Sequence, residues 1–221
     1  MWRDLDSYTV PEWAHSALIV IDTQVDFVDG GASPIPGTSE VLPVIRRLLS
    51  VYRAARRPIV HVVRLYEGED VDLPRRALIA SGAQLVRPGS PGSQIVPTLL
   101  PSGAGDLDHA RLLGGEMQRL AESEWAMWKP RWGAFHRTPL HVHLKTLDVS
   151  TVVLAGCNYP NCPRATVYGA SERDYRVLVV ADAISGIRAD HLDEAARMGV
   201  AQATSDEIGM QLAALAPTSV P

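Results

Sequence analysis

The sequence predicts an α/β protein built around a doubly wound, mostly parallel sheet. Four short runs rich in Val, Ile and Leu are typical of strands buried on both faces of such a sheet, at residues 16–21, 57–63, 151–155 and 176–181. Helical patterns follow these runs, at residues 40–56, 139–147, 162–174 and 190–203. Strands that alternate with helices indicate βαβ units, whose strands lie parallel. The weaker segments 125–129 and 200–204 are candidates for further strands.

The composition suits one globular domain. The chain has 221 residues, of which 46% are hydrophobic and 21% charged, so we expect a single domain over residues 1–221. A net charge of -4 provides no basic field for nucleic acid or anionic lipid, and neither is an expected partner. The apolar runs are far shorter than a membrane span of about 18 residues. Because residues 1–6 contain acids and no apolar stretch, we expect no signal peptide and a cytoplasmic location.

Residues 66–115 interrupt the alternating pattern. Glycine and proline recur throughout this stretch, which favours an irregular excursion over a core element. Long excursions in compact domains are usually functional, so we interpret this one as a lid or substrate loop. An ordered surface insertion without a role is the alternative. The last residues, 217–221, are expected to fray.

A cysteine follows the apolar run 151–155 at the turn into a predicted helix. Cys162 lies in a polar Pro-Asn-Cys-Pro-Arg sequence, where backbone N–H groups converge and the helix dipole favours a thiolate. That environment is typical of a nucleophile. Cys157 instead continues the apolar strand and fits a buried, unreactive thiol. No disulfide is expected, because a chain without an export signal is kept reduced.

Two further polar residues follow predicted strands. Asp22 comes directly after the first apolar run, and Lys129 ends the segment 125–129 between two tryptophans. The carboxyl ends of parallel strands share the edge where open α/β sheets bind ligands. A partly desolvated lysine at that edge would lower the pKa of a nearby thiol. On position alone, Asp26 and Asp29 are alternatives to Asp22, and each residue taken singly also fits a surface or capping role.

Three motifs in this order resemble the isochorismatase-like cysteine hydrolases: Asp-x-Gln-x-Asp-Phe from Asp22, Lys-x-Arg-x-x-Ala-Phe from Lys129, and Gly-x-x-x-x-x-Cys ending at Cys162. The resemblance spans residues 17–186 and includes the segment 170–183. It implies a three-layer α/β/α fold with about six strands, and Asp22, Lys129 and Cys162 as a catalytic triad. It also implies that a C–N bond of a small amide, ureido or carbamoyl compound is hydrolysed through a thioester, releasing ammonia or an amine. Relatives often assemble as homodimers or homotetramers.

The resemblance also implies details of the turn before the nucleophile. It predicts a non-proline cis peptide, by position Cys157-Asn158, and Tyr159-Pro160 is a second possible cis site. The N–H groups of Asn158 and Cys162 are expected to form an oxyanion hole. Pro163 follows the nucleophile and has no N–H to add.

Substrate contacts are expected from five residues around the triad, although each also fits a structural role: Phe27, Arg131, Trp132, Tyr159 and Arg164. The two arginines are candidates for binding a substrate carboxylate. No cofactor is expected. No metal is expected either, because no two histidines have ligand spacing after the second strand, and His141 and His143 face different directions on a helix.

Other functions remain open from the sequence. An isochorismate-type vinyl-ether hydrolase would use acid catalysis from the aspartate and would not need Cys162. A non-catalytic interaction module of the same fold would be expected to lack a triad member. A flavin or nicotinamide oxidoreductase fits the βα alternation, but the first strand is not followed by G-x-G-x-x-G.

Overall fold

The computed structural model describes residue 2 and residues 5–215. This part of the chain forms one seven-stranded sheet with the order β3-β4-β2-β1-β5-β6-β7. Only the edge pair β3 and β4 is antiparallel within it. The predicted α/β class and mostly parallel sheet are therefore confirmed. The predicted fraying of residues 217–221 lies outside the described residues.

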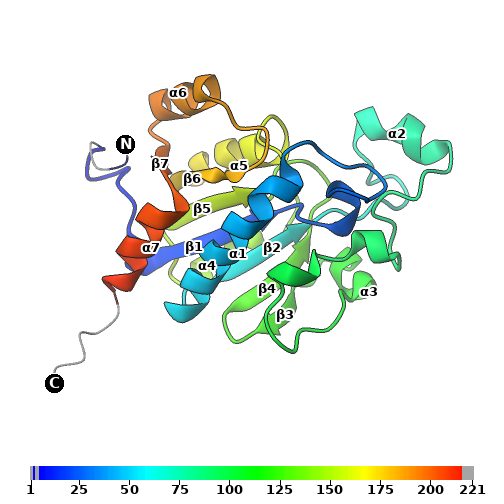
Figure 1. Cartoon of the computed structure of the whole chain (residues 1–221), viewed down its shortest axis with the longest axis horizontal. Coiled ribbons are helices and arrows are strands. Elements are labelled where there is room, and N and C mark those ends of the chain that lie inside the picture. The colour runs from blue at the N-terminus through cyan, green and yellow to red at the C-terminus, as the bar shows by residue number, and fades with distance from the viewer. Residues whose placement is uncertain (1, 3–4, 216–221) are drawn as a thin grey trace.

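The strands are β1 (Ser16–Ile21), β2 (Ile59–Val63), β3 (Gln118–Ala121), β4 (Glu124–Trp128), β5 (Thr151–Gly156), β6 (Arg176–Ile184) and β7 (Ala201–Ala203). The helices are α1 (Thr38–Ala54), α2 (Leu73–Ala80), α3 (His109–Leu113), α4 (Leu140–Thr146), α5 (Cys162–Ser171), α6 (Ala189–Arg197) and α7 (Ser205–Ala213). Figure 1 shows the helices arranged around the central sheet. The sheet has one strand more than the six expected, because β3 is a half-buried edge strand without an apolar run.

Helices cover both faces of the sheet, which gives the predicted three layers. Along β1 the side chains alternate between two apolar cores. Leu18 and Val20 belong to the core that α1 and α7 cover, whereas Ile19 and Ile21 belong to the core under α4, α5 and α6. Burial on both faces explains why the strand reads as a continuous apolar run.

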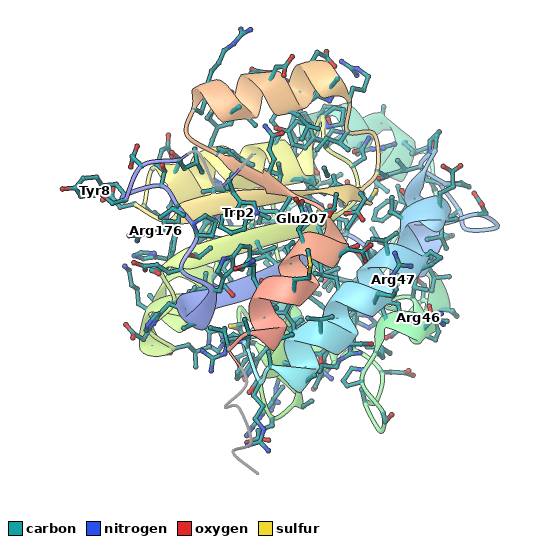
Figure 2. The ribbon with its side chains drawn as sticks, turned by 60° about the vertical axis from the view of Figure 1, so that its left-hand side comes forward. Trp2, Tyr8, Arg46, Arg47, Arg176 and Glu207 are labelled. Atoms are coloured by element: carbon teal, nitrogen blue, oxygen red, sulfur yellow. The ribbon has the colours of Figure 1, made fainter. Side chains whose placement is uncertain are left out.

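Helix α1 shows how the sequence pattern selects the buried face. Ile45, Leu48 and Tyr52 recur at helical spacing and are buried against the sheet. Arg46 and Arg47 fall on the opposite, exposed face, and Figure 2 labels both on the side of α1 away from α7. None of the helices in the described part of the chain has the length and apolar character needed to cross a bilayer.

The excursion at residues 66–115 is largely irregular, as predicted, but it contains the short helices α2 and α3. Helix α2 buries none of its residues and stands away from the sheet in Figure 1. The excursion is attached by a small apolar cluster in which Val71, Leu85 and Val86 contact Phe27 and Cys157. It therefore covers part of the carboxyl edge of the sheet.

Candidate active site

Four polar side chains gather at the carboxyl edge of the sheet. Asp22 directly follows β1, Arg64 follows β2 and Lys129 follows β4, while Cys162 is the first residue of α5 beyond the end of β5. Parallel pairing of these strands brings their carboxyl ends together, which places residues far apart in sequence at one point.

Asp22 and Lys129 form a buried ion pair. The Lys129 Nζ atom lies 2.9 Å from Asp22 Oδ2, and the exposed fractions of the two side chains are 0% and 6%. Asp22 has a φ of 51°, the left-handed conformation that aspartate tolerates better than most residues. Within the described residues, the buried Oδ1 atom of Asp22 has no hydrogen-bond partner. This carboxylate therefore keeps one oxygen available for a proton.

The Cys162 thiol is buried beside this pair. Burial raises the pKa of the thiol to about 11, and the negative charge of Asp22 adds to the rise, while the positive charges of Lys129 and Arg64 act against it. The expected lowering by Lys129 is present, but burial and Asp22 outweigh the two cations, so the net pKa of the thiol is raised. A thiol of this kind is protonated near neutral pH and needs a base to become a nucleophile.

Arg64 is a site residue that the sequence analysis missed. Its side chain is 2% exposed, and its Nη2 atom lies 3.8 Å from Cys162 Sγ. Burial alone would lower the pKa of the guanidinium, but the surrounding acidic groups, Asp22 foremost, outweigh burial and hold that pKa above its ordinary value. Nη2 also lies 3.1 Å from Oδ2 of Asp72, in the excursion. The only sequence signal was an arginine directly after a fully apolar strand.

The turn from β5 to α5 is shaped by a glycine. Gly156 has a φ of +120°, and a Cβ atom there would lie 2.2 Å from the carbonyl oxygen of Ile21. That close approach lets the Cys157 N–H donate to the same carbonyl oxygen at 2.8 Å. The described residues contain no cis peptide bond, so the prediction of cis Cys157-Asn158 or Tyr159-Pro160 is wrong.

Two backbone N–H groups of this turn are free of backbone partners in the described structure and could bind an anion. The N–H groups of Cys157, Tyr159 and Asn161 donate to backbone carbonyls. Within the described residues, those of Asn158 and Cys162 donate to no backbone carbonyl. Cys162 also begins α5, where the helix dipole favours negative charge. Both predicted oxyanion donors are thus unoccupied by the backbone.

A small cavity of about 40 Å³ borders the thiol, and Asp22, Phe27, Arg64, Trp132 and Cys162 are among its lining residues. This volume holds a few water molecules and is far below the roughly 300–1,000 Å³ of ligand pockets. Trp132 also lines an open groove of about 430 Å³. Admission of a substrate therefore requires movement of side chains or of the excursion.

The five predicted substrate contacts fall in different places. Phe27 and Trp132 line the cavity. Arg131 lies on the open groove and pairs with Asp70 at 3.1 Å. The other two are engaged with α6: Tyr159 is buried and stacked on His191 with ring centroids 5.0 Å apart, and Arg164 pairs with Glu194 at 2.5 Å.

The other polar residues in and after the first motif lie in the loop that follows β1. Asp26 is buried and accepts the N–H of Val86 at 2.6 Å, which fixes the excursion to this loop. Gln24 is also buried: its amide donates to the Arg64 carbonyl at 2.8 Å and accepts the Arg64 N–H at 2.7 Å. Asp29 lies at the exposed end of the loop, where its N–H donates to the hydroxyl oxygen of Ser39.

The histidines lie away from this site. His61 is buried in β2 and contacts Glu124 at 2.7 Å, and the same carboxylate pairs with Arg53 at 2.8 Å. His141 contacts the hydroxyl of Tyr175. Among the described residues, no cluster of three His, Cys, Asp or Glu side chains is arranged to hold a metal ion.

The fold and the site define a class of protein: a three-layer α/β domain with a buried cysteine, aspartate and lysine at the carboxyl edge of a parallel sheet. The isochorismatase domain family matches residues 16–107 and 105–208. The chain therefore belongs to the isochorismatase family of hydrolases.

Several relatives place the chain within this family. A "Probable inactive nicotinamidase" of Arabidopsis thaliana is 33% identical over 178 residues, which covers 77% of this chain and 81% of the relative. The ureidoacrylate amidohydrolase RutB of Methylorubrum extorquens is 30% identical over 187 residues, 76% of this chain and 68% of the relative. The crystal structure of an isochorismatase family protein from Desulfovibrio vulgaris is 31% identical, with a TM-score of 0.76 over 90% of this chain and 98% of that one.

A more distant structural neighbour supports the fold alone. N-carbamoylsarcosine amidase from Thermoplasma acidophilum is 23% identical, with a TM-score of 0.69 over 86% of this chain and 96% of that one. The predicted family resemblance is thus confirmed by both sequence and structure.

Proposed function

We propose that this protein is a cysteine-dependent hydrolase that cleaves a C–N bond of a small amide, ureido or carbamoyl compound through a thioester. One observation carries the proposal: a buried Asp22–Lys129 ion pair lies beside the Cys162 thiol, with one carboxylate oxygen unpartnered among the described residues. A protonated thiol beside a carboxylate with a free oxygen is a nucleophile paired with its base.

The proposed reaction uses Asp22 three times. Its carboxylate takes the thiol proton as the Cys162 sulfur attacks the substrate carbonyl carbon. The protonated Asp22 then gives that proton to the leaving nitrogen, and ammonia or an amine departs. Finally the carboxylate activates water, which hydrolyses the thioester and frees the thiol. Lys129 keeps a positive charge beside Asp22 through these steps.

The N–H groups of Asn158 and Cys162 are proposed to hold the oxyanion of each tetrahedral intermediate. They fit this role because neither donates to a backbone carbonyl in the described structure. One such donor contributes roughly 2.7–4 kcal/mol to the transition state. Phe27 and Trp132 are the apolar walls that we propose for the substrate, because both line the cavity.

The names of the relatives fit this reaction class. An amidohydrolase of a ureido compound is among the relatives at 30% identity or above, and a carbamoyl amidase shares the fold. We extend from them only the bond type, and we propose residues 66–115 as the lid because part of this segment covers the site. Assembly as a homodimer or homotetramer and a cytoplasmic location remain predictions.

An ammonia-release screen over small amides, ureas and carbamoyl compounds tests the proposal. For any compound that releases ammonia, turnover should fall by at least about a thousandfold in Cys162→Ala, because no other group replaces the nucleophile. Cys157→Ala is the matched control and should keep turnover, since burial raises the pKa of the Cys157 thiol to about 12 and leaves it unreactive. Full turnover in Cys162→Ala would refute the proposal, and a vinyl-ether hydrolase would release no ammonia.

A further inference from the structure

Arg64 has no place in the reaction scheme, yet its guanidinium contacts the reacting sulfur. It is one of the largest side chains that the structure buries completely. A buried guanidinium is costly unless it is paired and hydrogen-bonded. Its partners therefore indicate what it does.

The partners divide between the site and the excursion. Nη1 donates to the carbonyl oxygen of Lys129 at 3.4 Å, and Nη2 lies 3.8 Å from Cys162 Sγ. The same Nη2 atom lies 3.1 Å from Oδ2 of Asp72. One guanidinium nitrogen thus contacts both the nucleophile and a carboxylate of the excursion.

Both ends of this bridge are fixed in position. Gln24 holds the Arg64 backbone through its amide hydrogen bonds, and the guanidinium lies over the Tyr66 ring, 5.6 Å from its centroid. The Tyr66 hydroxyl donates to Asp72 Oδ2 at 3.2 Å. Asp72 is itself buried, directly before α2. The geometry of the bridge is therefore part of the packed structure.

Proton transfer moves one negative charge across this cluster. Before transfer, Asp22 pairs with Lys129 and Asp72 pairs with Arg64, and the charge of Asp22 also acts on Arg64. When the Cys162 proton passes to Asp22, the carboxylate becomes neutral and the sulfur becomes the anion. The net charge of the cluster is unchanged, but the negative charge now lies beside Arg64. A buried anion is stabilised by a cation at this distance.

We propose that Arg64 is a further catalytic residue, which stabilises the Cys162 thiolate, and that Asp72 limits this effect by sharing the same guanidinium nitrogen. The proposal rests on the proposed function, because it takes Cys162 as the nucleophile. It also ties reactivity to the excursion: docking of residues 70–72 sets how much of the Arg64 charge the sulfur receives.

Several other titratable groups also lie near the thiol. The titratable groups that line the cavity or contact the thiol or its arginine are Asp22, Arg64, Tyr66, Asp72, Arg75, Lys129 and Cys157. Arg75 lines the same cavity from α2 but has no contact with Sγ in the described structure. The test therefore changes Asp72 and Arg64 and leaves the rest in place.

The experiment is a thiolate titration by ultraviolet absorbance in a Cys157→Ala background. A protein that also carries Cys162→Ala supplies the baseline, so the difference belongs to Cys162. Asp72→Asn should lower the thiol pKa by about 1, because the guanidinium then loses its competing anion. Adding Arg64→Met to that variant should raise the pKa by about 1 to 3, because an opposite charge within 4 Å is lost.

Asp70→Asn is the matched control. Asp70 belongs to the same segment but pairs with Arg131 and Arg137 instead of Arg64, so this variant should leave the thiol pKa in place. An unmoved pKa when Arg64→Met is added would overturn the proposal. If that variant fails to fold, equal effects of Asp72→Asn and Asp70→Asn overturn it instead, and a selective effect of Asp72→Asn supports it.

The titration needs no substrate, so the two proposals fail separately. Normal ammonia release with an unmoved thiol pKa would refute the role of Arg64 alone. A shifted thiol pKa in a protein that hydrolyses no C–N bond would refute the proposed function and leave the electrostatic bridge intact.

Discussion

Replacing Lys129 by methionine should destabilise the fold strongly, because it leaves the buried Asp22 carboxylate without its cation. The pair is separated by 2.9 Å, and neither side chain is more than 6% exposed. At an effective dielectric constant of about 20, the attraction at this separation is about 6 kcal/mol. Desolvation offsets part of that attraction in the intact pair, and measured losses on removing one partner of a buried pair are about 3–5 kcal/mol.

Urea denaturation followed by circular dichroism measures this loss of stability. In a separate thermal melt of a chain of this length, a loss of about 3–5 kcal/mol corresponds to a fall in Tm of about 6–20 °C. Lys145→Met is the control, because Lys145 is exposed and its ammonium lies over the Tyr175 ring, a contact that contributes about 0.5–1 kcal/mol. The double variant Lys129→Met/Asp22→Asn should recover most of the lost stability. If Lys129→Met loses less than about 1 kcal/mol of stability, the carboxylate is not stabilised by this pair. A double variant as unstable as Lys129→Met would also contradict a role for the pair.

Three further outcomes follow from the geometry. Gly156→Ala should lower stability by about 2–4 kcal/mol and reduce turnover, because the new Cβ would lie 2.2 Å from the Ile21 carbonyl oxygen; an unchanged denaturation midpoint would contradict this. Burial alone would raise the pKa of Glu124, but hydrogen bonds from its two basic partners hold it below the ordinary value. Stability should therefore fall as pH drops from about 5, because the unfolded chain takes up this proton first, and Glu124→Gln should reduce that slope by up to one proton, about 1.4 kcal/mol per pH unit. Trp132→Ala should speed alkylation of Cys162, since Trp132 lines both the open groove and the cavity beside the thiol; an equal rate would place the entrance elsewhere.

The fold was predictable because its central strands are buried on both faces. That burial produces the continuous apolar runs of β1, β2 and β5, and the carboxyl ends of β1 and β5 then place Asp22 and Cys162 at the same edge of the sheet. Strand β3 escaped prediction because Gln118–Ala121 is half-buried and pairs only at the edge. Helix 190–203 was predicted too long, because α6 ends at Arg197 and the chain turns into β7.

The site was only partly predictable, because its electrostatics depend on the excursion. Nothing local to Arg64 signals that Asp72 will reach it, since that contact forms only when residues 66–86 fold over the sheet edge. The net rise of the thiol pKa was not predicted, for a related reason. Local sequence indicates the helix dipole and the lysine, but the burial that outweighs them is set by the tertiary packing.

The most direct test of the account is to trap the covalent intermediate. A compound that releases ammonia is mixed with the protein, the reaction is quenched with acid, and intact and peptide masses are measured. A nucleophilic Cys162 predicts an acyl adduct on the peptide that contains Cys162, absent in Cys162→Ala and slower to form in Asp22→Asn, which loses the base for both acylation and deacylation. Ammonia release without any adduct, together with full turnover in Cys162→Ala, would contradict a nucleophilic cysteine.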